Sequence, residues 1–163
     1  MSQTHRLTDQ VKILHKVGIV SNKQVLLLKR NAQAHYRPEK WDLPGGNAEW
    51  PLESSQVLLE HLHRADAVRE VQEETGITID EEQVIDPIFF DTFLETEKQV
   101  YTIVVGWLIK LANQPQVILS SEHTEFAWVS LSKLKEYDFG FAGGSDGFLV
   151  QIIKQAFARI AIE

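Results

Sequence analysis

The sequence predicts an α/β protein, an α/β/α sandwich with a central mixed β-sheet. Three observations support this fold class. Two β-branched runs near the start flank a short polar tripeptide, further strand-like runs fill the middle of the chain, and two segments carry apolar residues at helical spacing. Helices that cover both faces of one sheet give three layers.

Two antiparallel strands are expected between Val11 and Arg30. The apolar runs VKILHKVGIV and QVLLLKR flank Ser21-Asn22-Lys23, which is typical of a hairpin turn. The next stretch, Asn31–Lys40, is polar and leads into WDLPGG. There, Pro44-Gly45-Gly46 interrupts any regular element and permits unusual backbone angles. We therefore expect a loop over a site.

A helix is expected between Ser54 and Thr75, at least over the half from Ala65 onward. Ser54 or Ser55 could cap its start, and Gly76 suits the position just after its end. The apolar residues at helical spacing are Val57, Leu58, Leu62, Ala65, Val68 and Val71.

Further strands are expected at Pro87–Leu94, at Gln99–Leu111 and near Phe126–Val129, with a turn at Asn113-Gln114-Pro115. A C-terminal amphipathic helix should pack on the sheet, with Ser145 or Asp146 as its cap. Its apolar stripe consists of Phe148, Leu149, Ile152, Ile153, Ala156, Phe157 and Ile160. No repeat or linker interrupts the chain, so we expect one domain over residues 1–163.

Composition excludes several kinds of protein. The 163 residues are 44% hydrophobic, as in a globular domain, and the absence of cysteine excludes disulfides, thiolate metal sites and cysteine nucleophiles. With 16 basic and 23 acidic residues the net charge is -7, which argues against binding to a nucleic acid polymer. No signal peptide or bilayer-spanning run is evident, so the expected location is the cytoplasm, without a membrane partner.

An acidic cluster marks the end of the first predicted helix. Glu70, Glu73 and Glu74 stand at i, i+3 and i+4, so their carboxylates share one face at the negative end of the helix dipole. Like-charge pairs cost about 0.2–0.5 kcal/mol each and the dipole about 0.3–1 kcal/mol for each acid. An acidic run alone is more often a solvated surface. Arg69 and the upstream Gly45-Gly46 pair favour a cation site instead, and oxygen ligands suit Mg²⁺ or Mn²⁺.

The run REVQEETGI, from Arg69 to Ile77, resembles the second half of the Nudix box, whose pattern is G-x5-E-x7-R-E-U-x-E-E-x-G-U with U aliphatic. WDLPGG is similar to the loop that leads into the box, and VGIVSNKQVLLLKR to the first hairpin of the family. Glu122–Leu134 resembles the segment after the sheet, where members often supply one more acid. The resemblance covers roughly Val11 to Leu134 and implies a Nudix-type sandwich.

One departure from the pattern lies inside the box. Its glycine, placed at Gly46, is 23 residues before Arg69 rather than 14. The first glutamate of the box falls on His61 or on Leu52, depending on the end from which it is counted, and the acids near it are Glu49, Glu53 and Glu60. The extra segment, roughly residues 50–61, could prolong the helix, shape the substrate site or form a contact in a homodimer.

The resemblance implies an Mg²⁺-dependent hydrolase that cleaves a phosphoanhydride bond in a nucleoside diphosphate linked to another moiety. A nucleoside triphosphate pyrophosphohydrolase is the first expectation. The alternatives are a hydrolase of a nucleotide sugar, ADP-ribose or a dinucleotide, and, from another class, a non-catalytic domain that senses a nucleotide or binds a partner. In each enzymatic case the partner is a small nucleotide.

The resemblance also implies roles for particular residues. Glu70, Glu73 and Glu74 would hold the metal, Arg69 would keep them in register, and Glu122 would be a further ligand or the general base. The expected substrate-binding residues are Arg30, Tyr36, Gly45, Gly46, Phe141 and Asp146.

Aromatic and histidine side chains near these residues carry further expectations. Phe90 and Phe139 could stack on a base, although Phe90 is expected in the core. His61 and His63 are expected on a helix surface, and His123 could lie behind the metal ligands.

Overall fold

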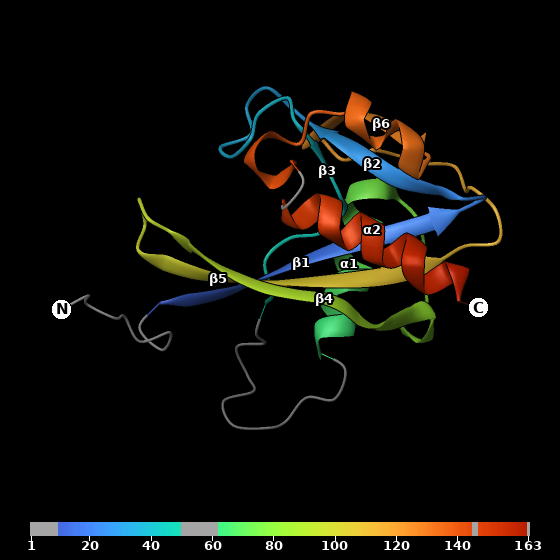
Figure 1. Ribbon diagram of the computed structural model, residues 1–163, viewed down its shortest axis with the longest axis horizontal. Coiled ribbons are helices and arrows are strands. Elements are labelled where there is room, and N and C mark those ends of the chain that lie inside the picture. The colour runs from blue at the N-terminus through green and yellow to red at the C-terminus, as the bar shows by residue number, and fades with distance from the viewer. Residues whose placement is uncertain (1–9, 50–61, 145–146, 163) are drawn as a thin grey trace.

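The computed structural model of the chain describes residues 10–49, 62–144 and 147–162. Six strands and two helices make up most of these residues (Figure 1). In chain order they are β1 (Val11–Ser21), β2 (Gln24–Arg30), β3 (Trp41–Asp42), α1 (Leu62–Thr75), β4 (Val84–Glu95), β5 (Val100–Lys110), β6 (His123–Val129) and α2 (Phe148–Ala161). Short 3₁₀ helices occur at Glu81–Gln83, Leu131–Glu136 and Gly140–Ala142.

The six strands form one mixed sheet. Its order is β3-β2-β1-β5-β4, and β6 pairs with β2. Strands β1 and β5 are parallel, whereas the other pairs are antiparallel. The first hairpin turns through Asn22 and Lys23, whose φ angles of 49° and 59° are those of the turn that fits the twist of two-residue hairpins. The predicted hairpin and the mixed sheet are thus confirmed.

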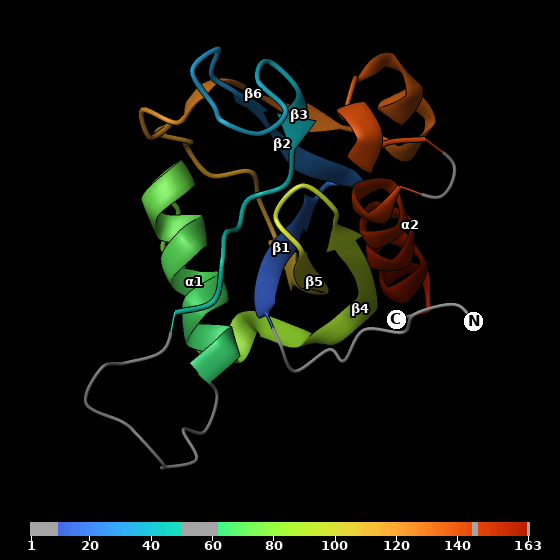
Figure 2. The same ribbon diagram turned by 90° about the vertical axis from the view of Figure 1, so that its left-hand side faces the viewer.

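Strands β1 and β2 pair only next to their turn, at Val20–Val25 and Ser21–Gln24. Beyond it they diverge, and the chain after β3 runs along β1 in the space between them (Figure 2). The backbone N–H groups of His15 and Val17 donate to the carbonyls of Gly46 and Pro44, each at 2.8 Å. These bonds hold the glycine loop against β1.

Two apolar clusters lie on opposite faces of the sheet. Because side chains alternate along a strand, Leu26 and Leu28 of β2 join the cluster under α1, while Val25 and Leu27 join the cluster under α2. Helix α1 contributes Ala67 and Val71 to the first cluster. Helix α2 buries part of the predicted stripe in the second: Leu149, Ile152, Ile153 and Ala156. The α/β/α sandwich is confirmed, and Figure 2 shows the two helices on either side of the sheet.

Several boundaries of strands and helices differ from those expected from the sequence. Strand β4 begins at Val84 and its pairing with β5 shifts between Ile85 and Phe89, which explains why Pro87 is tolerated on this edge strand. Strand β6 begins at His123, three residues before the expected start. The N-cap of α2 is Gly147, and the proposed caps Ser145 and Asp146 lie outside the described residues, as does the stretch from Ser54 to His61.

Phe90 was expected in the core, and this expectation is wrong, because 68% of its surface is exposed. Its neighbour Phe89 packs into the cluster under α2, so Phe90 points to the opposite face of the sheet. It lies on β4, at the edge of the sheet.

Neither helix of the described residues is long and apolar enough to cross a membrane.

Candidate active site

A cleft of about 810 Å³ lies beside the glycine loop and brings together segments that are far apart in the sequence. Its walls come from the loop after β2, the C-terminal half of α1, the β4–β5 turn and the chain around Glu122. Eight of the predicted site residues line it: Arg30, Tyr36, Gly45, Gly46, Glu70, Glu74, Glu122 and Phe141. Arg69 and Glu73 stand outside the lining, and Asp146 is outside the described residues.

The three glutamates of α1 have different surroundings. Glu70 and Glu74, at i and i+4, face the cleft, with side chains 13% and 10% exposed. Glu73 has a side chain that is 59% exposed, and its Oε2 lies 3.0 Å from Nη1 of Arg69. Nη2 of the same guanidinium is 2.8 Å from Oε1 of Glu70. Arg69 therefore contacts both Glu70 and Glu73, whereas Glu74 is bound by the glycine loop.

The two glycines meet these acids directly. The N–H of Gly45 donates to Oε2 of Glu74 at 2.8 Å. Gly45 has φ +133°, and a Cβ there would lie 2.2 Å from the carbonyl oxygen of His15. A Cβ on Gly46 would lie 2.7 Å from Oε1 of Glu70. Position 45 therefore requires glycine, because the backbone of β1 cannot move away, whereas at position 46 a Cβ would displace the Glu70 carboxylate.

Burial makes the cleft a costly place for negative charge. It raises the pKa of Glu74 to about 8, although Lys16 and the Gly45 N–H oppose the shift. Burial also raises the pKa of Glu70, against the effect of Arg69. A carboxylate whose ionised form is disfavoured in this way is stabilised by a nearby cation.

A fully buried carboxylate, Asp42 of β3, lies behind the glutamates and was not singled out from the sequence. Its oxygens are 3.0 Å from Lys16 Nζ, 3.2 Å from Arg30 Nη1 and 2.5 Å from Arg37 Nη2. Burial alone would raise its pKa, but Lys16, Arg37 and Arg30 together hold the pKa below its usual range. Lys16 also donates to the carbonyls of Leu43 and Gly45, so it fixes the glycine loop. No spacing pattern links these residues in the sequence.

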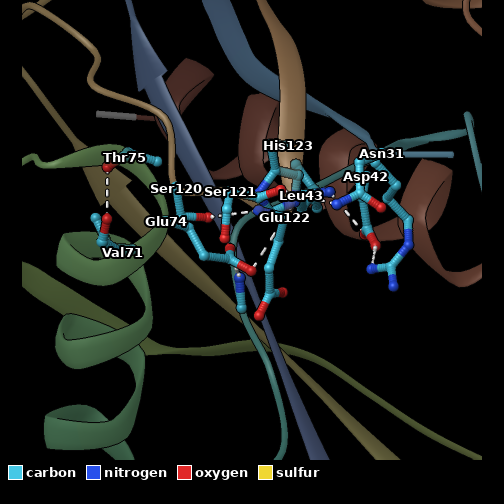
Figure 3. Close-up of polar contacts among 12 residues, drawn as sticks. Asn31, Asp42, Leu43, Val71, Glu74, Thr75, Ser120, Ser121, Glu122 and His123 are labelled. Atoms are coloured by element: carbon cyan, nitrogen blue, oxygen red, sulfur yellow. Dashed lines mark hydrogen bonds and ion pairs between the residues drawn. The ribbon is translucent and has the colours of Figure 1, made fainter. Parts of the chain in front are cut away.

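Glu122 reaches the cleft because the chain before β6 is attached to the end of α1. The N–H of Ser120 donates to the carbonyl of Glu74 at 3.2 Å, and that of Asn31 donates to the carbonyl of Glu122 at 2.9 Å. Figure 3 shows the side chains of Glu74 and Glu122 next to each other. His123 is buried, with Nε2 at 3.9 Å from Oε1 of Glu74, and burial lowers its pKa to about 4. It therefore lies against Glu74 as a neutral imidazole.

The aromatic candidates divide in two. Phe141 is 71% exposed and Tyr36 38% exposed, and both line the cleft. The guanidinium of Arg37 lies 5.8 Å from the centre of the Phe141 ring. Phe139, by contrast, is only 3% exposed and belongs to the core under α2, so it is not available for stacking.

Among the acids considered for the first glutamate of the box, Glu49 is the one within the described residues. It lines the cleft, and its Oε1 is 3.8 Å from Nη2 of Arg69. Glu53, Glu60 and the rest of the extra segment lie outside these residues.

His63 was expected on the helix surface, but it is only partly exposed. Its ring lies 5.1 Å from that of His15 and its Nδ1 is buried, because α1 packs this side against β1. His61 lies outside the described residues.

The donors of the cleft suit a divalent cation. The described lining has seven acidic residues, Asp42, Glu49, Glu70, Glu74, Glu95, Glu97 and Glu122, and five basic ones, Lys12, Lys16, Arg30, Arg37 and Lys98. Asp42 is paired with three of these bases, and Lys12 with Glu95. Glu49 and Glu70 contact Arg69, which lies outside the lining. Among the described residues, Glu74, Glu97 and Glu122 have no lysine or arginine within ion-pair distance, and Glu74 and Glu122 line the cleft together with Glu70. Hard carboxylate oxygens are the ligands that Mg²⁺ and Mn²⁺ prefer.

Comparison with known proteins identifies the family. No curated protein matches the chain, but the NUDIX domain profile matches residues 16–145. The MutT protein from Methanosarcina mazei Go1 is 28% identical, with a TM-score of 0.69 over 97% of this chain and 100% of that one.

Two more distant structures share the fold. The Ap4A hydrolase of C. elegans, solved as a binary complex, is 24% identical, with a TM-score of 0.65 over 93% of this chain and 99% of that one. The NUDIX domain of Shewanella oneidensis NrtR, complexed with ADP ribose, is 16% identical, with a TM-score of 0.66 over 94% of this chain and 90% of that one. The family is typically dependent on divalent metal ions. With the profile covering most of its length, this chain belongs to the Nudix hydrolase family.

Proposed function

We propose that this protein is an Mg²⁺-dependent pyrophosphohydrolase that cleaves a phosphoanhydride bond in a nucleoside triphosphate. One observation carries the proposal: two largely buried carboxyl groups, those of Glu70 and Glu74, face one cleft, and no lysine or arginine of the described residues lies within ion-pair distance of Glu74. The nearest basic ring, that of His123, is held neutral by burial. A divalent cation would stabilise the ionised form of both carboxyl groups. Its positive charge would also allow an anionic substrate to bind to an acidic protein.

The metal would be held by Glu70 and Glu74, with Glu122 and Glu73 as further candidate ligands. Glu73 would have to leave its contact with Arg69 to reach the cleft, whereas Glu122 already lines it. When bound, the ion would offset the charge of the phosphates and ease attack of water on phosphorus. Mn²⁺ would occupy the same oxygens.

The protein's own groups would orient the reaction. In the hydrolysis, the oxygen of water forms a bond to phosphorus, the bridging P–O bond breaks, and the leaving phosphate keeps the bridging oxygen. Glu122, an exposed carboxylate at the cleft, is our candidate for accepting the proton of the attacking water. Arg69 would hold Glu70, and the N–H of Gly45 would hold Glu74.

The remaining cleft suits a nucleoside. A volume of about 810 Å³ is in the range of small-molecule sites. Phe141 presents an exposed ring and Tyr36 a half-exposed one, and such rings can stack on a base. Arg30 lines the same space, although its guanidinium is already held by Asp42 and the carbonyl of Tyr36. We further propose that Asp146 contacts the substrate.

A nucleotide sugar, ADP-ribose or a dinucleotide is the second candidate substrate, because each contains the same diphosphate. Two structures that share the fold are named as an Ap4A hydrolase and as a complex with ADP ribose. Their identity to this chain is too low to choose between these ligands, so substrate choice rests on experiment.

The test is a panel of nucleoside triphosphates, nucleotide sugars, ADP-ribose and dinucleotides, assayed with Mg²⁺ or Mn²⁺ and with chelator. We expect metal-dependent release of a phosphate-containing product, fastest from a nucleoside triphosphate. Glu74→Gln is the matched control, since it keeps the shape of the side chain and removes its charge. If no compound is turned over, the protein is a nucleotide-sensing or partner-binding domain instead.

A further inference from the structure

A second polar cluster, largely buried, lies next to Arg69. It consists of His15 of β1 and of His63 and Asp66 of α1, whose nearest nitrogen and oxygen atoms lie within 4.8 Å of one another. His15 is 0% and Asp66 5% exposed. Nε2 of His15 and Nδ1 of His63 are buried without a hydrogen-bond partner among the described residues. Two imidazoles and a carboxylate could in principle bind a transition metal.

The contact with Trp107 of β5 argues against metal binding by His15. Its indole Nε1–H donates to Nδ1 of His15 at 3.0 Å. An indole nitrogen can only donate, so Nδ1 carries the lone pair and the proton of the neutral ring is on Nε2. Burial, with a smaller effect of His63, lowers the pKa of His15 to about 4, so the ring is neutral at working pH. A ligand nitrogen needs a lone pair, and Nε2 has a hydrogen.

Nε2 of His15 lies 3.8 Å from Oδ2 of Asp66, which is longer than a hydrogen bond but close enough for electrostatic attraction. The backbone N–H of Glu49 donates to the same Oδ2 at 3.2 Å. Oδ1 of Asp66 lies 3.5 Å from Nη2 of Arg69, the nitrogen that contacts Glu70 at 2.8 Å. The contacts therefore run from the core to the cleft.

We infer that Asp66 is a positioning residue for Arg69 and, through it, for Glu70, and that Trp107 and His15 hold Asp66 in place. The inference rests on the proposed metal site at Glu70 and Glu74. Asp66 fixes the guanidinium from behind, so that Arg69 presents Nη2 to Glu70 instead of turning toward solvent. Removing the groups that orient metal ligands typically weakens metal binding 10–100-fold.

The test is binding of Mn²⁺ to the protein without substrate, followed by the electron paramagnetic resonance of free Mn²⁺. We expect Asp66→Asn to raise the Kd for Mn²⁺ about 10-fold or more. Asp86→Asn is the matched control, because Asp86 also pairs with an arginine of α1, Arg64, and neither residue lines the cleft. Its Kd should be that of the wild type.

The outcomes are distinguishable. If the wild type binds no Mn²⁺, the proposed metal site fails. If the wild type binds Mn²⁺ and Asp66→Asn binds it equally well, the metal site stands and the positioning role fails. Thermal unfolding of each variant shows whether the fold is retained, and a loss of Mn²⁺ affinity shared by Asp86→Asn would mean a general effect on α1.

A measurement on the wild type covers the case in which Asp66→Asn does not fold. In ¹⁵N spectra of the histidines, we expect His15 to be protonated at Nε2 and not at Nδ1, and we expect Trp107→Phe to lose this preference and to bind Mn²⁺ more weakly. Protonation at Nδ1 would overturn the inference. So would a shift of the His15 and His63 signals on addition of Zn²⁺, since the cluster would then be a metal site.

Discussion

At the scale of single residues, Gly45 and Gly46 are neighbours in the sequence with different constraints. Ala at position 45 must adopt φ +133° and meets the backbone of His15, so Gly45→Ala should lower the free energy of unfolding by more than about 1 kcal/mol. Gly46→Ala meets only the end of the Glu70 side chain, which can move. We expect a folded protein that has lost turnover about 10-fold or more. Urea denaturation measures the stability of both variants, and initial rates measure their turnover. Equal losses of stability in the two variants would contradict the prediction.

The acids of α1 should also differ in importance. Glu70 and Glu74 face the cleft and Glu73 does not, so Glu74→Gln should reduce kcat at least about 100-fold and Glu73→Gln less. Initial rates over a range of Mg²⁺ concentration give both kcat and the metal dependence. A larger loss in Glu73→Gln would mean that Glu73 turns into the cleft when metal binds.

The buried histidines make stability sensitive to acid. The pKa values of His15 and His123 fall from 6.5 to about 4 in the folded protein, so below pH 6.5 the unfolded chain binds protons that the native protein does not. The stability due to each neutral ring is therefore present above pH 6.5 and is lost as the pH falls toward 4. For His15 the loss is about 3 kcal/mol at most.

The check is the slope of the unfolding free energy between pH 6.5 and 4 in wild type and in His15→Gln. In this pH range the slope of the free energy of unfolding against pH should be smaller in the variant, by the amount that corresponds to about one bound proton. This difference does not depend on the absolute stability of the variant. Parallel curves would show that His15 is protonated in the native state.

At the scale of elements, the docking of α2 depends on a residue without a side chain in β5. A Cβ on Gly106 would lie 2.7 Å from Cγ1 of Ile152 in α2 and 2.8 Å from Cβ of Phe89 in β4. Gly106→Ala should therefore destabilise the protein by about 1–3 kcal/mol through overpacking. Because Gly106 is absent from the cleft lining, the kcat of the folded fraction should be unchanged, which denaturation and active-site titration can test together. A changed kcat would show that the packing of α2 affects the site.

Elements far apart in the sequence build the cleft through backbone bonds. The end of α1 is tied to the chain before β6 by Ser120 and Ile118, whose N–H groups donate to the carbonyls of Glu74 and Thr75. The glycine loop is tied to β1 by His15 and Val17. These bonds fix the end of α1 to the chain before β6 and the glycine loop to β1.

At the scale of the whole molecule, metal binding should stabilise a protein of net charge -7. A ligand that binds only the native state adds about 2.7 kcal/mol at a concentration 100 times its Kd. We expect Mg²⁺ to raise Tm, chelator to reverse the rise, and the double variant Glu70→Gln/Glu74→Gln to show none. A Tm rise of the same size in the double variant would place the ion elsewhere.

The layers of the fold and the acidic end of α1 follow from local patterns in the sequence. Alternation in β2 and the stripe of α2 predict which faces are buried, because these periods are local properties of strands and helices. The spacing of Glu70 and Glu74 places both on one face of α1 for the same reason. The hairpin at Asn22 and Lys23 also follows from local turn chemistry.

The surroundings of those acids, by contrast, follow from tertiary contacts. Asp42 and its partner Lys16 come from different elements, as do Asp66, His15 and Trp107, and no pattern in the sequence links them. The exposure of Phe90, the burial of Phe139 and the partial burial of His63 likewise depend on which neighbour covers each face. Local periodicity fixes the side of an element on which a residue lies, but burial and charge at a site depend on partners brought together by long-range pairing, which no local pattern records.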